Sequence, residues 1–239
     1  MRYPNGTEAL RGLDLEVRAG ELVVILGGNG CGKTTLLRSI TRAVKPTAGQ
    51  VWLNGRDLVS LEGEALRSAR MDLAMIWQQA NLVRRRSVIA NIACGALGRN
   101  RTWWTALGGL PNAELPAAYE ALGQVGLAHL APQRAGTLSG GQAQRVSIAR
   151  ALMQRPSVLL ADEPVASLDP EAATDIMRLL QRLARHDGLA VLCVLHQVDL
   201  AFGFADRIVG MRAGRAVFDR PTGGVSSDEV QELYQKRAA

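Results

Sequence analysis

A glycine-rich stretch at residues 27–35, GGNGCGKTT, has the residue types that hold phosphate groups. It fits the pattern G-x-x-x-x-G-K-[ST] and stands between an apolar run, ELVVILGG, and a helical pattern, KTTLLRSITRAV. Glycines let successive backbone N–H groups face phosphate oxygens, and the start of a helix adds partial positive charge. We expect the lysine to reach the β- and γ-phosphates of a nucleotide and the first threonine to coordinate Mg²⁺. This phosphate loop consists of Gly27, Gly28, Asn29, Gly30, Cys31, Gly32, Lys33, Thr34 and Thr35.

Two carboxylates and a histidine follow apolar runs further along the chain. Asp162 and Glu163 end the run SVLLADE, and His196 ends LAVLCVLH. Acids at such a position often only cap a helix, but a phosphate loop needs an acidic partner for Mg²⁺, which Asp162 supplies through coordinated water. Glu163 is then free to polarise the attacking water as general base. A lone histidine is more often structural, but a phosphate pocket beside His196 favours a functional interpretation.

A second stretch, TLSGGQAQR at residues 137–145, also resembles a phosphate site. It precedes the apolar helical pattern VSIARAL, so a Ser-Gly-Gly turn opens a helix, as in many anion sites. This signature turn consists of Ser139, Gly140, Gly141 and Gln142.

A mainly parallel sheet is needed to bring these residues together. Strand patterns at residues 21–26, 71–78, 157–162 and 189–196 alternate with helical patterns, which predicts the α/β class. Asn54–Gly55 and the sequence around Gly214 predict two hairpins and therefore an antiparallel β edge.

The strand pattern disappears between residues 79 and 150, where helical stretches are broken by Gly and Pro. We interpret residues 79–150 as an inserted helical subdomain. Residues 1–78 and 151–220 then form the core, and residues 221–239 form a C-terminal helical tail, in which VSSDEVQELYQKRAA has a serine cap followed by acidic residues.

Composition narrows the possible partners. The net charge of +6 comes from scattered arginines, and nucleotide phosphates would satisfy it as well as nucleic acid. Cys31, Cys94 and Cys193 show no Cys-x-x-Cys spacing, which argues against a disulfide framework and a zinc site. No apolar run approaches the roughly 18 residues of a spanning helix, so we expect any membrane role to be peripheral.

In order and approximate spacing, these motifs resemble those of the ATP-binding-cassette ATPases. LSGGQ shortly before the Asp-Glu strand is the most specific of them. The resemblance implies a P-loop NTPase fold with a RecA-like core, with ATP as ligand and Mg²⁺ as cofactor. The motifs that carry it are GGNGCGKTT at 27–35, LSGGQ at 138–142, LLADEP at 159–164, SLD at 167–169 and His196.

The resemblance also implies roles for further residues. Gln78 matches a glutamine that senses the metal and the attacking water, so it would share Mg²⁺ with Thr34 and Asp162. His196 matches a switch residue that contacts the γ-phosphate. Tyr3 falls where the family stacks an aromatic ring on adenine, although the edge strand that usually precedes this position has no counterpart in the sequence.

Two segments are implied to act between subunits. Ser167, Leu168 and Asp169 match a loop that communicates across a dimer. The signature turn would bind the γ-phosphate of ATP held by a second copy's phosphate loop, so two copies would sandwich two ATP molecules and neither half would be competent alone.

Within that superfamily the chain resembles the ATP-binding subunits of phosphonate importers over nearly its whole length. The sequence segments that support this resemblance are YPNGTEAL, MIWQQANLVRRRSV, LADEPVASLDP, LHQVDLAFGFADRIVGMRAGRAVFD and RTWWTALGGLP. The resemblance implies integral membrane permease subunits, an extracytoplasmic substrate-binding protein acting indirectly, no nucleic acid, and a peripheral position at the cytoplasmic face of the inner membrane. Importers of other anions or of amino acids share several of these segments, so such an importer is one alternative. Two further alternatives are a soluble cassette ATPase that acts on DNA or ribosomes and a binding protein that has lost hydrolysis.

Two weaker features are left with two interpretations each. Residues 84–86, three arginines, form either a solvated face or the surface where the family meets its membrane subunits. Trp103 and Trp104 are either packed within the helical subdomain or exposed as a contact.

Overall fold

The computed structural model describes residues 1–100, 105 and 112–234. Its centre is a six-stranded sheet in the order β4-β5-β6-β1-β7-β8. Every neighbouring pair is parallel except β7 and β8, which are antiparallel. The predicted α/β class, with a mainly parallel sheet and an antiparallel edge, is therefore confirmed. The strands are β1 (Leu22–Leu26), β4 (Leu73–Ile76), β5 (Val158–Asp162), β6 (Ala190–Val194), β7 (Arg207–Arg212) and β8 (Arg215–Pro221).

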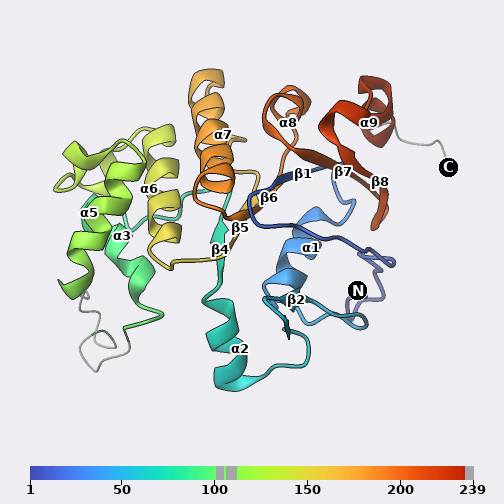
Figure 1. Cartoon of the computed structure of the whole chain (residues 1–239), viewed down its shortest axis with the longest axis horizontal. Coiled ribbons are helices and arrows are strands. Elements are labelled where there is room, and N and C mark those ends of the chain that lie inside the picture. The colour runs from blue at the N-terminus through green and yellow to red at the C-terminus, as the bar shows by residue number, and fades with distance from the viewer. Residues whose placement is uncertain (101–104, 106–111, 235–239) are drawn as a thin grey trace.

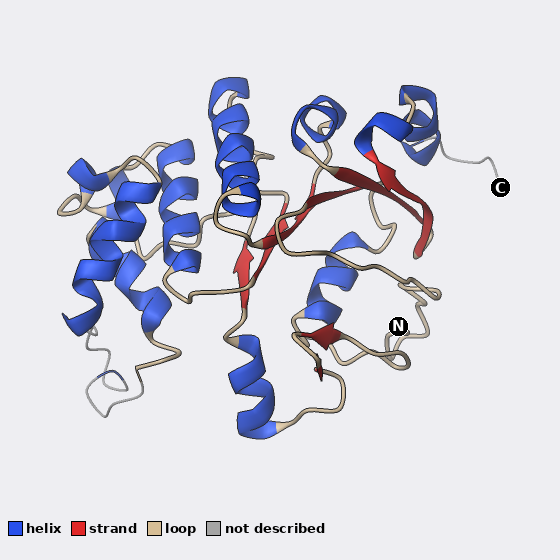
Figure 2. Ribbon diagram, in the orientation of Figure 1, coloured by secondary structure: helices blue, strands red, loops and turns tan. Residues whose placement is uncertain are grey.

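Helices cover both faces of the sheet, which is why the central strands β1 and β6 are apolar and buried throughout. In β1, Leu22 and Leu26 face one core and Val23 faces the other, and all are fully buried. Figure 2 shows the sheet running between two helical layers. One face carries α7 (Pro170–Arg185), α8 (Val198–Phe204) and α9 (Ser227–Tyr234); the other carries α1 (Lys33–Ile40) and α2 (Gly63–Arg70).

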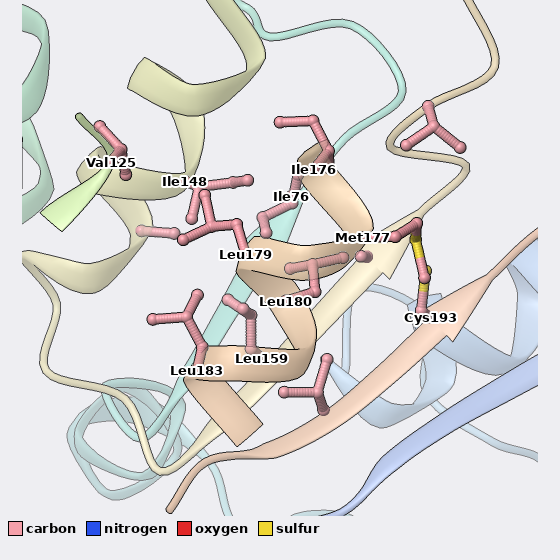
Figure 3. Packing of buried hydrophobic residues seen from close by; sticks show 14 of the residues in the cluster. Ile76, Val125, Ile148, Leu159, Ile176, Met177, Leu179, Leu180, Leu183 and Cys193 are labelled. Carbon is pink, nitrogen blue, oxygen red and sulfur yellow. The ribbon is translucent and has the colours of Figure 1, made fainter. Parts of the chain in front are cut away.

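The long helix α7 shows how the larger core is built. Its buried residues recur at helical spacing, as Ile176, Leu180 and Leu183 illustrate, and they lie over Ile76 of β4 and Leu159 of β5 (Figure 3). Each such side chain contributes about 1.5–3 kcal/mol when it leaves water. This packing fixes the strands whose ends carry the candidate site.

Both predicted hairpins are present. β2 (Trp52–Leu53) and β3 (Arg56–Asp57) are joined by Asn54 and Gly55, with φ of +48° and +75°. The turn between β7 and β8 has φ of +48° at Ala213 and +79° at Gly214. Positive φ at both central residues is what a two-residue hairpin requires.

The described elements between β4 and β5 are helical, apart from an isolated bridge between Ser87 and Arg134. Figure 1 groups α3, α5 and α6 at one end of the molecule. The division of the chain into a core, a helical subdomain and a tail stays a prediction. Trp103 and Trp104, for which the sequence left two interpretations, lie outside the described residues. The elements are α3 (Val88–Ala93), α5 (Leu115–Gln124), α6 (Gly140–Leu152), and the 3-10 turns Cys94–Ala96, Asn112–Glu114, Ala128–Leu130 and Ala135–Thr137; a further 3-10 turn, Thr222–Gly224, precedes α9.

Within the described part of the chain, no helix is both long and apolar enough to cross a membrane. Near the N-terminus, Arg2 and Glu8 form an isolated antiparallel bridge rather than a full strand.

Candidate active site

The phosphate loop connects the end of β1 to the start of α1. Gly32 is the N-cap of α1 with a φ of +113°, and it provides no side chain to cap the helix. A Cβ on Gly27 would lie 2.3 Å from the carbonyl oxygen of Met211, so only glycine fits there. The first N–H groups of α1 are therefore left for an anion, as the pattern of the loop predicts.

The side chain of Lys33 is hydrogen-bonded to the backbone of the phosphate loop. Its Nζ donates to the carbonyl oxygens of Gly27, at 2.6 Å, and Gly28, at 3.2 Å, and the residue is only 6% exposed. A buried ammonium surrounded by loop backbone concentrates positive charge at the helix start.

Tyr3 lies beside this loop. Its hydroxyl is 3.2 Å from Oγ1 of Thr35, in the first turn of α1. The structure thus brings the N-terminal segment to the phosphate loop, where the resemblance expects an adenine-stacking ring.

The ends of three parallel strands bring the other residues to the same edge. In register across β5, β6 and β1, Asp162 pairs with Val194, and Val194 pairs with Ile25. Beyond this row, the Glu163 N–H donates to the Val194 carbonyl oxygen at 3.1 Å. Glu163, His196 and the phosphate loop therefore all follow directly from neighbouring strand ends.

Glu163 and His196 are in direct contact. Nε2 of His196 lies 2.6 Å from Oε1 of Glu163. Glu163 has a φ of +50°, a left-handed conformation that is uncommon for a residue with a side chain and that is often found at functional sites. This contact joins the candidate general base to the candidate switch histidine.

Asp162 has an unfavourable electrostatic environment. Burial raises the pKa of its carboxyl, and the neighbouring charge of Glu163 raises this pKa further, whereas Arg38, Lys33 and His196 lower it. The register of β5, β6 and β1 places Asp162 two strands from the strand that leads into the phosphate loop, at the same edge of the sheet.

The residues present fit Mg²⁺ bound together with phosphates. No group of three or more His, Cys, Asp or Glu side chains gathers as a metal site among the described residues, so other oxygens would have to complete the shell. Mg²⁺ prefers oxygen ligands and commonly uses one carboxylate with substrate phosphates. Thr34 and Gln78 have exposed side chains that offer such oxygens, and a cation would relieve the repulsion between Asp162 and Glu163.

The signature turn is capped by its own residues. Ser139 is the N-cap of α6, and its Oγ accepts from the Gln142 N–H at 3.2 Å. In return, Oε1 of Gln142 accepts from the Ser139 N–H at 3.0 Å, which completes a capping box.

The loop at residues 167–169 lies against the signature turn of the same chain. A Cβ on Gly140 would lie 3.2 Å from Cδ2 of Leu168, and one on Gly141 would lie 3.0 Å from Cβ of Ala172. Asp169 caps α7 by accepting from the Ala172 N–H at 2.9 Å. The exposed Ser167 precedes this contact.

The signature turn and the phosphate loop are carried by different parts of the molecule. Figure 1 shows α6 among the helices at one end and α1 under the sheet, on either side of β4 in that view. The structure therefore brings together the phosphate loop, Asp162, Glu163 and His196, while the signature turn starts a helix elsewhere in the chain.

Two residues near the site were missed from the sequence. Gln144, only 2% exposed, donates from Nε2 to the Trp77 carbonyl oxygen at 3.0 Å, directly before Gln78. Tyr234 on α9 lies beside the phosphate loop: burial raises the pKa of its phenol, and a hydrogen bond from the Gly27 backbone lowers it. Both residues are polar and sit in helical patterns, where the sequence predicts solvent contact. The arginines at 84–86 are exposed.

Comparison with known proteins assigns the chain to a family. A family model described as ABC transporter matches residues 10–166. The "Phosphonates import ATP-binding protein PhnC" of Thiobacillus denitrificans is 49% identical over 236 residues, covering 98% of this chain and 90% of that protein. "Phosphonates import ATP-binding protein PhnC 2" of a Synechococcus species is 46% identical over 233 residues, covering 98% and 87%.

Solved structures agree with the sequence relatives. The cbiO1 protein from Clostridium perfringens, described as part of the ABC transporter complex cbiONQ, aligns with a TM-score of 0.84 at 29% identity, over 97% of this chain and 89% of that one. The ATP-binding cassette MJ0796, described as dimeric in a post-hydrolysis state bound to ADP and Pi, aligns with a TM-score of 0.77 at 32% identity, over 91% and 92%.

Proposed function

Because the chain belongs to the ABC transporter family of ATP-binding proteins, we propose that it is the ATP-hydrolysing subunit of a membrane importer that takes up phosphonate or a related phosphorus oxyanion. ATP binding and hydrolysis are the activities of this family. The observation that carries the proposal is the meeting of the phosphate loop, Asp162 and the Glu163–His196 pair at one sheet edge. The relatives named for phosphonate import support the transported class.

The residues at this edge divide the chemistry between them. The phosphate loop binds the β- and γ-phosphates, with Lys33 supplying the charge. Thr34, Gln78 and Asp162 would hold Mg²⁺, which would neutralise phosphate charge when bound. Glu163 accepts a proton from the attacking water, and His196, which contacts Glu163, contacts the γ-phosphate.

Two copies of the chain form the working unit in this proposal. The signature turn of one copy completes the γ-phosphate site on the phosphate loop of the other. Within each copy, Leu168 packs against Gly140, so the loop at 167–169 is in contact with the signature turn and would move with it when the second copy binds. The relative MJ0796, described as dimeric, is consistent with it.

The membrane partners are also part of the proposal. The permease would dock near the exposed Trp77, Val83 and arginines 84–86, which follow β4. The dimer would act at the cytoplasmic face of the inner membrane, and a substrate-binding protein outside would deliver the oxyanion. The alternative is a cassette ATPase for another anion or amino acid, which would use the same ATP chemistry.

Reconstitution with the native permease tests this function. The complex is purified from membranes and placed in proteoliposomes, and ATP hydrolysis is measured with phosphonate, phosphite, sulfate or an amino acid delivered by the cognate binding protein. We expect phosphorus oxyanions alone to stimulate hydrolysis. Stimulation by an amino acid instead would support the alternative importer, and capture of the chain only with nucleic acid or ribosomes would contradict import altogether.

A further inference from the structure

Gln144 is a buried amide on α6, two residues beyond the signature turn. It is 2% exposed, and its Nε2 donates to the Trp77 carbonyl oxygen at 3.0 Å. A buried amide without a partner costs about 1–3 kcal/mol, so this hydrogen bond fixes the backbone at Trp77 relative to α6. The next residue in the chain is Gln78.

Arg150, nearer the end of α6, binds the same segment after Gln78. Its Nη2 donates to the Ala80 carbonyl oxygen and its Nη1 to the Asn81 carbonyl oxygen, both at 2.8 Å. Asn81 has a φ of +49°, a turn that allows two consecutive carbonyls to face one guanidinium. Burial lowers the pKa of Arg150, so its charge depends on these contacts for compensation.

The backbone is thus attached to α6 on both sides of Gln78, while the Gln78 side chain itself is exposed. The buried Asn91 of α3 continues the attachment: its Oδ1 accepts from the Val83 N–H at 2.7 Å, and its Nδ2 donates to the Val83 carbonyl oxygen at 3.2 Å. The segment 77–83 is therefore held by helices, although it follows a strand of the central sheet.

We propose that Gln144 and Arg150 are positioning residues for Gln78. They join its segment to the helix whose first residues are the signature turn, so a movement of Ser139 toward a second copy's nucleotide displaces Gln78 with it. The mechanism needs no flexible link, because one continuous helix, α6, carries the turn and both attachments. This inference rests on the role proposed for Gln78 at the metal and the attacking water.

Hydrogen exchange on the full chain tests the attachment directly. In Gln144→Leu, we expect the Val83 amide within residues 78–83, whose N–H donates to Asn91 Oδ1, to exchange at least about tenfold faster, with β5 unchanged, because local opening of this segment becomes easier. Arg150→Lys keeps the charge but loses the planar fork, and should show a smaller increase in the same peptide.

Gln154→Leu is the matched control. The Gln154 amide donates to the carbonyl oxygens of Arg70, Met71 and Leu73 at 2.9, 3.1 and 2.5 Å, so its loss removes similar contacts away from residues 78–83. Exchange in residues 78–83 should stay at the wild-type rate in this variant. An equal increase in Gln154→Leu, or none in Gln144→Leu, would overturn the attachment.

A double-mutant cycle of ATP hydrolysis tests the consequence. Gln144→Leu should lower kcat about tenfold and leave KM for ATP within about twofold, because the phosphate loop is untouched. Combined with Gln78→Ala, it should add no further loss, since both act through Gln78. Additive losses would overturn the positioning role alone. Full turnover in Gln78→Ala would instead overturn the function proposed for Gln78, whatever the exchange result.

Discussion

The phosphate loop and the signature turn both place glycines at a helix start, but they differ in what satisfies the first N–H groups. At α1 the N-cap is Gly32, which has no side chain to offer, and Lys33 adds a buried charge. At α6 the capping box of Ser139 and Gln142 already occupies the turn. The first is open to an anion within its own chain, whereas the second is locally complete.

This difference explains how one motif can serve two purposes. A serine hydroxyl can accept a hydrogen bond and still donate its own proton. Ser139 can therefore keep its cap from Gln142 and donate to a phosphate that a second copy presents. The proposed hydrolytic groups lie instead with the phosphate loop, where Glu163 contacts His196. In the function proposed above, each chain thus contributes a half-site that binds and hydrolyses ATP and a folded turn that donates to the partner's ATP.

Glu163→Gln should have the largest effect, because it removes the base from the phosphate-loop half and leaves the signature half intact. Turnover should fall by about 10²–10⁴, while ATP binding persists. Unhydrolysed ATP should then keep two copies together, as a dimer seen in size-exclusion chromatography only with ATP. Glu171→Gln, an exposed acid in the first turn of α7, is the matched control and should behave as wild type. A Glu163→Gln variant that stayed monomeric in saturating ATP would contradict the shared site for the isolated subunit.

Ser139→Asp is expected to have the next largest effect, because it separates capping from phosphate binding. Aspartate caps a helix as well as serine does, so α6 should fold normally. Its carboxylate has no proton to donate and would repel the γ-phosphate, so turnover should fall about 10²–10³ while ATP affinity of the monomer is unchanged.

Ser139→Thr is the control for this variant, since it keeps both the cap and the hydroxyl, and it should retain turnover within a few-fold of wild type. ATP binding by calorimetry and steady-state hydrolysis separate the two functions. Near-normal hydrolysis in Ser139→Asp would show that the signature turn does not meet phosphate.

The sequence predicted the elements that local patterns determine. The alternation of strands and helices, the Asn54–Gly55 hairpin and the strand-end acids are short-range features, and the structure has each of them. The contacts of Gln144 with Trp77 and of Tyr234 with the phosphate loop join residues far apart in the chain. A polar residue in a helical pattern predicts exposure. Only tertiary packing decides that Gln144 is buried and donates to the Trp77 carbonyl oxygen, or that the partly exposed Tyr234 lies beside the phosphate loop. The proposed roles of the site residues depend on ATP and a second copy, which no local pattern includes.

Asp162→Asn is expected to give the smallest effect when the readout is thermal stability without nucleotide or Mg²⁺, and it tests whether the phosphate-loop half-site is electrostatically prepared for a cation. The pKa of Asp162 is raised in the folded state, so the folded protein binds this proton more tightly than the unfolded chain does. Stability should therefore fall as pH rises from the ordinary carboxyl pKa through the raised one, and the loss is fully present above that window. Replacing the carboxylate with an amide removes this cost.

Because Asp162 is only half-buried, solvent screens the interaction, and we expect a gain below about 1 kcal/mol at neutral pH, or at most about 2–4 °C in Tm. Thermal unfolding without nucleotide or Mg²⁺, from pH 4 to 8, measures it, and Asp187→Asn, an exposed acid after α7, is the control. With ATP and Mg²⁺ present the order should reverse, because wild type gains the bound cation and the variant does not. Lower stability of Asp162→Asn than of wild type without ligands would show that the carboxylates of Asp162 and Glu163 do not repel each other enough to cost stability. The difference between the two half-sites would then rest on their helix caps alone.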